Sequence, residues 1–273
     1  MSPGAFSYFG DSIMNGNSNT NVLNVPGVES VKYKRNLIDI AVCELRFPTL
    51  LELEKKPPVK LQAKLRKKYP HYELQQRAEF TNTESVPGHL RYLFRSKSRA
   101  WSVTIHSGAI SIETSSYTEF EEFYDRLFEL LQESKTLIDS DFFTRVGLRY
   151  INTVPILDNI FKEWINPHLE SNLTEGPYGN PQKYAAEIRG LTVVGNYTFR
   201  HGIKGIKENT ISEYLLDFDY YKEDVQYNEV AALIKEFNKI NFSFFNWCIG
   251  PKAKEYLGQS ISKKKPRKGA ASD

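Results

Sequence analysis

Hydrophobic and polar residues alternate along several short stretches of the chain, as they do in β-strands that bury one face. The first stretch, residues 37–47, places Cys43 and Leu45 on one face. Further strands are predicted at residues 72–80, 90–95, 101–106 and 110–114. Ser107-Gly108 separates the last two, which predicts a tight hairpin with Gly108 at a positive φ.

Other segments carry apolar residues at the spacing of an α-helix. The clearest apolar stripe consists of Phe120, Phe123, Leu127, Leu130 and Leu131. Ser116 and Glu119 precede it at the spacing of a capping box, which predicts Ser116 as the N-cap. A later stripe consists of Val230, Leu233, Ile234, Phe237 and Ile240. A shorter helix, stopped by Pro70, is predicted around Leu61 and Leu65, which lie one turn apart.

The second half of the chain repeats the order of strands followed by a helix. The elements expected there are a strand at 141–153, a loop at 167–179, and strands at 183–189, 192–200 and 213–221. This order predicts an α+β fold, mainly antiparallel sheet with helices packed on one face. Either one unit or two sheet-plus-helix halves, residues 37–156 and 181–258, would satisfy the pattern.

The ends of the chain differ in composition from its centre. Residues 37–258 are expected to form a single α+β domain. Residues 1–36 are rich in Gly, Ser and Asn without a sustained period, so they are predicted to be a flexible arm. Residues 259–273 combine lysines with small residues and are predicted to be a disordered basic tail.

Composition narrows the class of protein. Aromatic residues make up 13% of the chain, which favours aromatic-rich strands over a leucine-rich bundle. The formal net charge of +3 is too small to indicate nucleic-acid binding unless it is clustered. Cys43 and Cys248 lie far apart and outside any CxxC motif, so zinc and thioredoxin-like sites are not expected. No apolar run reaches about 20 residues and no signal peptide is recognisable, so a cytoplasmic protein without membrane contact is predicted.

Three stretches carry a resemblance to a known family. They are Glu44-Leu-Arg-Phe-Pro48, the strand-turn-strand-helix unit 101–131, and Arg145-Val-Gly-Leu-Arg-Tyr-Ile-Asn152. Through them, residues 37–257 resemble a sporadically distributed family of uncharacterised bacterial proteins of about this length. The resemblance implies the same order of elements but supplies no activity and no catalytic residues. The patchy distribution of the family is similar to that of mobile accessory genes, including those of phage-defence islands.

Asp217 and Asp219 lie two residues apart in a predicted strand and therefore share one of its faces. Two such carboxylates can share a divalent cation, as a metal-dependent nuclease or other hydrolase requires. No Glu-x-Lys motif or histidine cluster accompanies them. The alternative is a half-buried strand in which Leu216, Phe218 and Tyr220 point inward and both acids point into water.

Arg145 and Arg149 lie on one face of a predicted strand, with Gly147 between them. Such a pair can bind a phosphate or a carboxylate through paired hydrogen bonds. The preferred interpretation is structural, because arginine within a sheet usually pairs with a carboxylate. Glu187 and Glu113 on neighbouring strands are the expected partners.

Basic residues cluster in two further places. They are Lys64, Lys67 and Lys68 on the predicted short helix, and Arg95, Lys97 and Arg99 beside the aromatic residues of a strand. Interleaved basic and aromatic side chains are typical of a surface that follows phosphates and stacks on bases. The competing interpretation is an ordinary solvated face next to core aromatics.

No catalytic signature accompanies these features, since the chain has no P-loop, nucleophile elbow, dinucleotide fingerprint or metal-binding histidine motif. The leading prediction is a non-enzymatic binding or assembly protein that needs no cofactor and acts with a protein partner or as a homo-oligomer. The resemblance implies a component of an accessory or phage-defence system. Two alternatives stay open: a nucleic-acid-binding protein that uses the basic residues, and a divalent-metal-dependent hydrolase or nuclease centred on Asp217 and Asp219.

Overall fold

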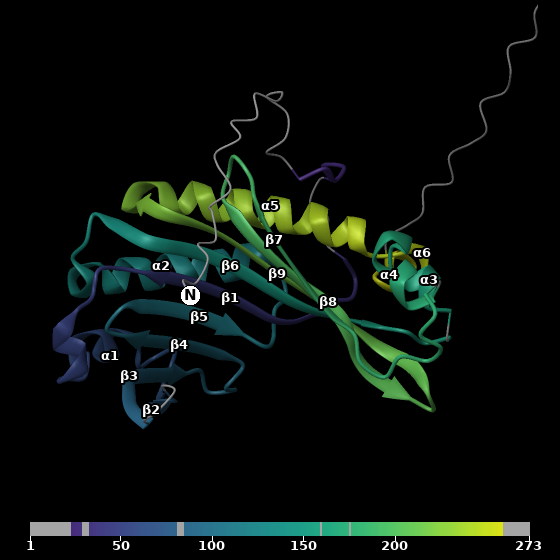
Figure 1. The fold of residues 1–273 in the computed structure, drawn as a ribbon. Coiled ribbons are helices and arrows are strands. Elements are labelled where there is room, and N and C mark those ends of the chain that lie inside the picture. Colours follow the sequence, from purple (N-terminus) through teal and green to yellow (C-terminus); the bar gives the residue numbers. More distant parts are fainter. Residues whose placement is uncertain (1–22, 29–32, 81–84, 159, 175, 259–273) are drawn as a thin grey trace, which may run out of the picture.

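A single antiparallel sheet runs through the protein and carries helices on one face (Figure 1). The computed structural model describes residues 23–28, 33–80, 85–158, 160–174 and 176–258. Within these residues the sheet has nine strands in the order β2-β3-β4-β5-β1-β6-β9-β8-β7. The strands are β1 (Ile38–Arg46), β2 (His71–Phe80), β3 (Ser85–Arg95), β4 (Trp101–His106), β5 (Ala109–Thr114), β6 (Phe142–Pro155), β7 (Ala185–Leu191), β8 (Asn196–Lys207) and β9 (Thr210–Gln226).

β1 and β6 form the centre of the sheet and join the two parts of the chain. β1 pairs with β5 on one side and with β6 on the other, and β6 pairs in turn with β9. The predicted α+β class with a mainly antiparallel sheet is confirmed. The halves 37–156 and 181–258 share this one sheet, because the β6–β9 pairing extends from one end of β6 to the other.

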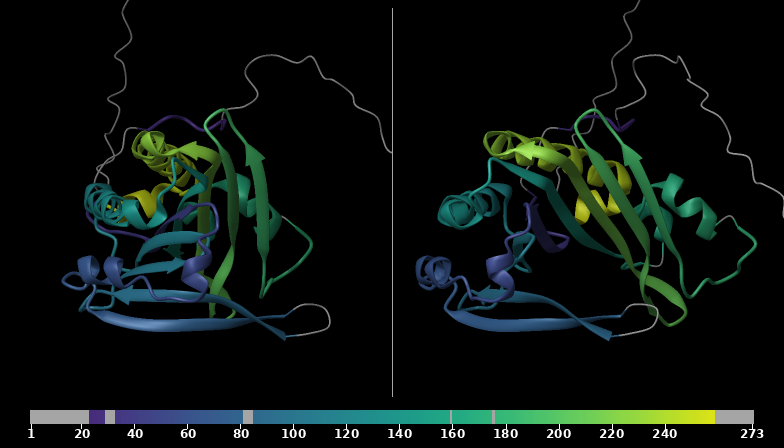
Figure 2. Two further views of the ribbon diagram at one scale, coloured as in Figure 1. Left: turned by 90° about the vertical axis from the view of Figure 1, so that its left-hand side faces the viewer. Right: turned by 60° about the vertical axis from the view of Figure 1, so that its left-hand side comes forward.

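Helices cover one face of the curved sheet, and α2 and α5 are the longest (Figure 2). They are α1 (Val59–Leu65), α2 (Phe120–Ile138), α3 (Phe161–Trp164), α4 (Pro167–Thr174), α5 (Val230–Cys248) and α6 (Pro251–Tyr256), with short 3-10 turns η1 (Leu51–Glu54) and η2 (Tyr227–Glu229). Both long helices bury an apolar stripe, and in α2 Phe123, Leu127 and Leu130 are buried as predicted. No helix in the described residues is long and apolar enough to cross a bilayer.

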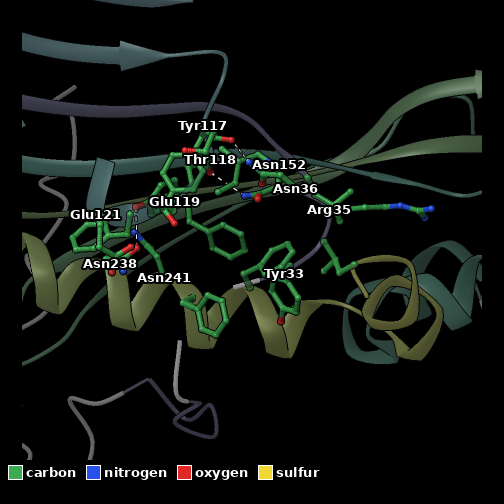
Figure 3. Close-up of a pocket in the computed structure, with 18 residues that line it drawn as sticks. Tyr33, Arg35, Asn36, Tyr117, Thr118, Glu119, Glu121, Asn152, Asn238 and Asn241 are labelled. Atoms are coloured by element: carbon green, nitrogen blue, oxygen red, sulfur yellow. Dashed lines mark hydrogen bonds between the residues drawn. The ribbon is translucent and has the colours of Figure 1, made fainter. Parts of the chain in front are cut away.

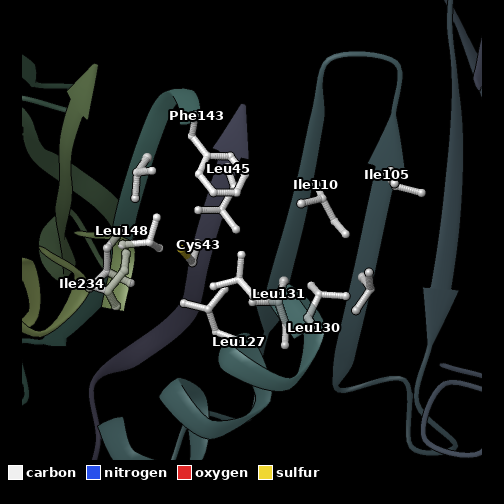
Figure 4. Close-up of a cluster of buried hydrophobic side chains, with 14 of the residues drawn as sticks. Cys43, Leu45, Ile105, Ile110, Leu127, Leu130, Leu131, Phe143, Leu148 and Ile234 are labelled. Atoms are coloured by element: carbon white, nitrogen blue, oxygen red, sulfur yellow. The ribbon is translucent and has the colours of Figure 1, made fainter. Parts of the chain in front are cut away.

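Two hydrophobic clusters fill the space between the sheet and the helices. The first joins β1, β4, β5 and β6 to α1 and α2, and it contains Cys43, Leu45 and Leu127 (Figure 4). The second joins β8 and β9 to α3, α4 and α6, and it contains Phe199 and Phe218. α5 begins in the first cluster and ends in the second. Each fully buried apolar side chain contributes about 1.5–3 kcal/mol, so these clusters are the main source of stability.

The predicted hairpin joins β4 to β5 through Ser107-Gly108, but its backbone differs from the expectation. Gly108 is not among the residues with a positive φ. The carbonyls of Ser107 and Gly108 instead accept hydrogen bonds from the amides of Leu50 and Phe47. The turn is therefore shaped by the segment that follows β1, and not by the hairpin alone.

α2 begins at Phe120 with Glu119 as its N-cap, so the predicted cap at Ser116 is wrong. No side chain makes a cap hydrogen bond at this end of the helix. Thr118 Oγ1 donates to Glu122 Oε2 (2.7 Å), so Thr118 contacts the first turn of the helix. The residues just before Phe120 connect β5 to α2 and border the cavity described below.

Two segments expected to be irregular contribute to the core. The stretch 167–179, predicted as a loop, begins with α4, whose Leu169 and Leu173 are buried. The described part of the predicted N-terminal arm also contacts the domain, since Tyr33 Oη donates to Asn246 Oδ1 (2.6 Å). The rest of the arm and the predicted basic tail lie outside the described residues.

Candidate functional site

Arg145 and Arg149 each form an ion pair with an aspartate of the neighbouring strand β9. Arg149 donates from Nε to Asp217 Oδ1 (2.8 Å) and from Nη2 to Oδ2 (2.7 Å). Arg145 donates from Nη2 to both oxygens of Asp219 (3.1 and 2.9 Å). The structural interpretation of the arginines fits this geometry, but their partners are these aspartates and not the expected glutamates.

The same ion pairs argue against a metal site at Asp217 and Asp219. Asp217 is only 2% exposed, and Arg200 lies 3.6 Å from it as a second cation. A divalent cation would have to displace guanidinium groups from a carboxylate that they already neutralise. The described residues contain no group of three or more His, Cys, Asp or Glu that could hold a metal ion. In the alternative interpretation, the inward positions of Leu216, Phe218 and Tyr220 are confirmed, but Asp217 is buried and does not point into water.

Burial and charge act together on these groups. Burial raises the pKa of Asp219, and the Arg145 guanidinium opposes the rise. The hydrogen bonds to Asp217 raise the pKa of Arg149.

Gly147 makes room for the Arg145 guanidinium, since an added Cβ would lie 2.6 Å from its Nη1. The pairs oppose a one-residue slip of β6 against β9, because such a slip would turn the charges to opposite faces of the sheet and leave them unpaired.

The pairs continue across the sheet as alternating charges, which we call the charged ladder. It comprises Arg189 and Glu187 on β7, Arg200 on β8, Asp217 on β9 and Arg149 on β6. Glu187 accepts hydrogen bonds from Nε of Arg189 (2.7 Å) and Nε of Arg200 (2.6 Å). The ladder lies on the face opposite the helices, since the alternate residues Leu148 and Phe218 are packed beneath them. It therefore contributes to strand pairing and not to the core.

The basic residues of α1 and its end are exposed, but acidic side chains of α2 neutralise part of their charge. Lys64 Nζ lies 3.0 Å from Glu133, and Lys68 pairs with Glu129. Lys67 is exposed. The predicted stripe of like charges is therefore a mixed surface, which attracts phosphates less strongly than the sequence indicates.

The second basic group lies at the end of β3 and in the turn that follows it. Arg95 lies 3.7 Å from Glu73 of β2. Lys97 and Arg99 are exposed in the turn, where Arg99 has a φ of 62°. The aromatic neighbours Tyr92 and Phe94 are buried in the core, so they cannot stack on bases.

A cavity of about 320 Å³ lies between α2 and α5 on the helical face of the sheet (Figure 3). Its walls come from the segment before β1, the beginning of α2, β6, β9 and α5. The polar side chains that line it include Asn36, Tyr117, Tyr150, Asn152, Asn238 and Asn241. The volume falls at the lower end of the range for small-molecule sites, about 300–1,000 Å³.

Hydrogen-bonded tyrosines and asparagines form the polar wall of the cavity. Tyr150 Oη donates to Asn238 Oδ1 (2.9 Å), and the ring of Tyr117 meets that of Tyr150 edge to face, with centroids 5.5 Å apart. Burial raises the pKa of Tyr117 to about 12 and holds the pKa of Tyr150 well above its ordinary value. Both phenols are therefore neutral at physiological pH. Asn152 Nδ2 donates to the carbonyl of Leu216 (3.2 Å), which fixes this amide against β9.

Asn241 differs from this pattern, because its Oδ1 has no hydrogen-bond partner among the described residues. It is 2% exposed, and its Nδ2 donates only a long bond to the carbonyl of Leu148 (3.4 Å). Asn246 on the same helix, by contrast, accepts from Tyr33 (2.6 Å) and donates to the carbonyl of Phe242 (2.9 Å). A buried acceptor without a partner costs about 1–3 kcal/mol. Asn241 lies on the cavity wall, so a rotation of its side chain would present this oxygen to a bound molecule.

Replacing Asn241 by leucine is expected to leave the free energy of unfolding unchanged or to raise it by up to about 1 kcal/mol. The change removes the unsatisfied oxygen at the loss of one long hydrogen bond. The matched change Asn246→Leu removes two well-formed hydrogen bonds, so it is expected to lower the free energy of unfolding by about 1–3 kcal/mol. Urea-induced unfolding measures both values. Equal losses in the two variants would show that Asn241 is an ordinary structural amide.

None of the polar residues of the cavity is predicted from the sequence as a site, although two of them interrupt an apolar pattern. Asn241 lies on the buried side of α5, and Asn152 continues the buried face that Leu148 and Tyr150 form on β6. At both positions the helix or strand pattern predicts an apolar side chain. Burying a polar amide there costs desolvation free energy, so such an amide indicates a structural or functional role. Asn238 gives no comparable signal, because its position on α5 is only half-buried.

Comparison of the chain with known protein families finds no match, and comparison with curated proteins finds none either. The polar wall of the cavity includes amides and neutral phenols, charged residues (Arg35, Glu119 and Glu121) also line it, and one buried acceptor of the wall residue Asn241 is unsatisfied within the described part of the chain.

Proposed function

We propose that this protein is a non-enzymatic binding protein that holds a small molecule in the cavity between α2 and α5. One observation carries the proposal: Asn241 lies on the cavity wall, and its buried Oδ1 has no partner among the described residues. A bound molecule with a hydrogen-bond donor would satisfy it. The chemistry of the asparagines and tyrosines on the wall supports binding over catalysis. Amides do not ionise and both phenols have raised pKa values, so these groups are poorly suited to proton transfer at neutral pH.

The segment before β1 supports a role in which binding is transmitted to the surface. This segment forms one wall of the cavity. Asn36 Nδ2 donates to the carbonyl of Tyr117 (2.5 Å), which joins that wall to the connection before α2. A molecule in the cavity contacts both sides of this junction and so stabilises the docked segment. A protein partner that recognises the segment would then respond to the ligand, as an assembly protein requires.

Nucleic-acid binding is less well supported than small-molecule binding. The lysines Lys64 and Lys68 are paired with acids of α2, and the aromatic residues beside Arg95 belong to the core. Exposed cations remain at Lys67, Lys97 and Arg99. Single exposed cations are common on protein surfaces, so they do not by themselves favour this function.

The protein-free small-molecule fraction of a cell extract is expected to raise the thermal midpoint of the wild-type protein. A ligand present at about 100 times its Kd stabilises the folded state by about 2.7 kcal/mol. For a chain of this size the corresponding rise is about 5–10 °C. The Asn241→Leu variant is expected to lose this response, because the ligand can no longer donate to residue 241.

The control for this experiment is Glu236→Gln, an exposed position on the same helix outside the cavity. This variant is expected to respond like the wild-type protein. No response in any of the three proteins would contradict the proposed function. An equal response in Asn241→Leu would place the binding site elsewhere in the protein.

A further inference from the structure

The cavity presents a hydrogen-bond acceptor and a donor side by side (Figure 3). Asn238 and Asn241 are three residues apart on α5, so their side chains lie on the same side of the helix. Asn241 Oδ1 is the unsatisfied acceptor. Asn238 Oδ1 is occupied by Tyr150 Oη, and within the described part of the chain no group accepts a hydrogen bond from Asn238 Nδ2. The two asparagines therefore suit a ligand that carries a hydrogen-bond donor, facing Asn241, next to a hydrogen-bond acceptor, facing Asn238.

Aromatic rings border this pair of amides. Phe242 and Phe245 follow Asn241 on α5, and Phe218 reaches the cavity from β9. Phe218 and Phe245 meet edge to face, with ring centroids 6.5 Å apart. Rings in such positions favour a flat, partly apolar ligand. The cavity volume of about 320 Å³ corresponds to about ten water molecules, because each water occupies about 30 Å³ in the liquid. This size suits a ligand of one or two rings.

The charges at the outer edge of the cavity disfavour an anionic ligand. Glu119 and Glu121 at the beginning of α2 both line it. Arg35 also lines it, but its guanidinium lies 4.5 Å from the ring of Tyr256 and donates to the carbonyl of that residue (3.3 Å). In Figure 3 Arg35 extends away from the asparagines. A phosphate or carboxylate at this edge would meet two like charges.

We propose that the ligand is an uncharged nucleobase-like heterocycle, free or as a nucleoside, which is recognised through a lactam edge. The proposal rests on the small-molecule binding proposed above. The ring N–H donates to Asn241 Oδ1, and the adjacent carbonyl accepts from Asn238 Nδ2. Asparagine is suited to this task, because its amide presents a donor and an acceptor to the edge of a base. The aromatic wall packs against the ring.

Titration calorimetry of the full-length protein with uridine and inosine tests this assignment. Each nucleoside carries a ring N–H beside a carbonyl, and at least one of them is expected to bind. The N-methylated counterparts, 3-methyluridine and 1-methylinosine, lack the donor and are expected to bind at least about tenfold more weakly. The 5′-monophosphates are also expected to bind at least about tenfold more weakly, because they bring a phosphate toward Glu119 and Glu121.

Variants separate recognition from folding. Asn241→Leu is expected to remove the preference for the unmethylated nucleoside, whereas Glu236→Gln keeps it. Equal affinity for the methylated nucleosides, or tighter binding of the monophosphates, would overturn the assignment. Absence of binding by both nucleosides would also overturn it. A thermal response to the small-molecule extract would in that case still support the proposed function, so the two failures are distinguishable.

Discussion

Substituting Asp217 by asparagine is expected to lower the free energy of unfolding by about 3 kcal/mol. The buried carboxylate compensates Arg149 and Arg200 in the charged ladder, and its loss leaves both guanidinium groups without this partner. The Arg149 side chain is 40% exposed, so water can solvate part of its charge. We therefore expect a cost at the lower end of the range for broken buried pairs, about 3–5 kcal/mol. Equilibrium unfolding in urea measures it.

The control is Asp125→Asn, at an exposed position on α2. A surface change of this kind is expected to alter the free energy of unfolding by less than about 0.5 kcal/mol.

Millimolar Mg²⁺ or Mn²⁺ is expected to leave the thermal midpoint of the wild-type protein unchanged, because Asp217 and Asp219 are occupied by arginines. A metal-induced rise that Asp217→Asn abolishes would reinstate the hydrolase hypothesis and contradict the structural role.

Acidification from pH 6.5 to pH 4 is expected to remove about 3 kcal/mol of stability through His201 alone. The side chain is 5% exposed, its ring stacks on Phe199, and its Nδ1 lies 2.7 Å from Tyr214 Oη. Burial lowers its pKa to about 4, whereas an unfolded histidine has a pKa of about 6.5. The unfolded state therefore binds more protons between these two values. Stability falls as the pH falls through this window and is unaffected by His201 above it.

The measurement is the free energy of unfolding of wild-type protein and His201→Gln at pH 7 and pH 4.5. The wild-type protein is expected to lose about 2–3 kcal/mol more than the variant between the two pH values. His71→Gln, at an exposed position on β2, is the matched control and is expected to behave like the wild-type protein. An identical loss in wild-type protein and His201→Gln would show that His201 is not buried in its neutral form.

Local periodicity predicts most of the secondary structure, because it depends on residues that are close in the sequence. The apolar stripes of α2 and α5 and the alternation along β4 and β6 all correspond to observed elements. Helix ends are predicted less well. Ser116 has the right spacing to Glu119 for a cap, yet the helix begins at Phe120 and Thr118 bonds to Glu122 instead. Competing polar contacts within a few residues decide such ends.

Pairing between distant strands is not encoded in local periodicity. Arg145 and Arg149 are predicted on one face of a strand, and Asp217 and Asp219 on one face of another. Nothing local indicates that β6 pairs with β9, which lies about 70 residues further along the chain. The pairing argues against both the anion-binding and the metal-binding hypothesis, because each arginine is occupied by an aspartate and each aspartate by an arginine.

The cavity could not be predicted for a related reason. It forms where α5 passes from one hydrophobic cluster to the other, and its walls come from segments far apart in the sequence. Only Asn152 and Asn241 mark it, since each places an amide at a buried position of its element. The Tyr150–Asn238 hydrogen bond that completes the wall depends on how α5 lies over β6.

Native mass spectrometry detects a complex between the protein and a ligand in its cavity. The wild-type protein is first incubated with the small-molecule fraction of a cell extract. We expect a complex of one protein with one small molecule of discrete mass, and we expect Asn241→Leu to give the mass of the protein alone. The mass of the protein alone in both samples would contradict a ligand-binding role for the cavity.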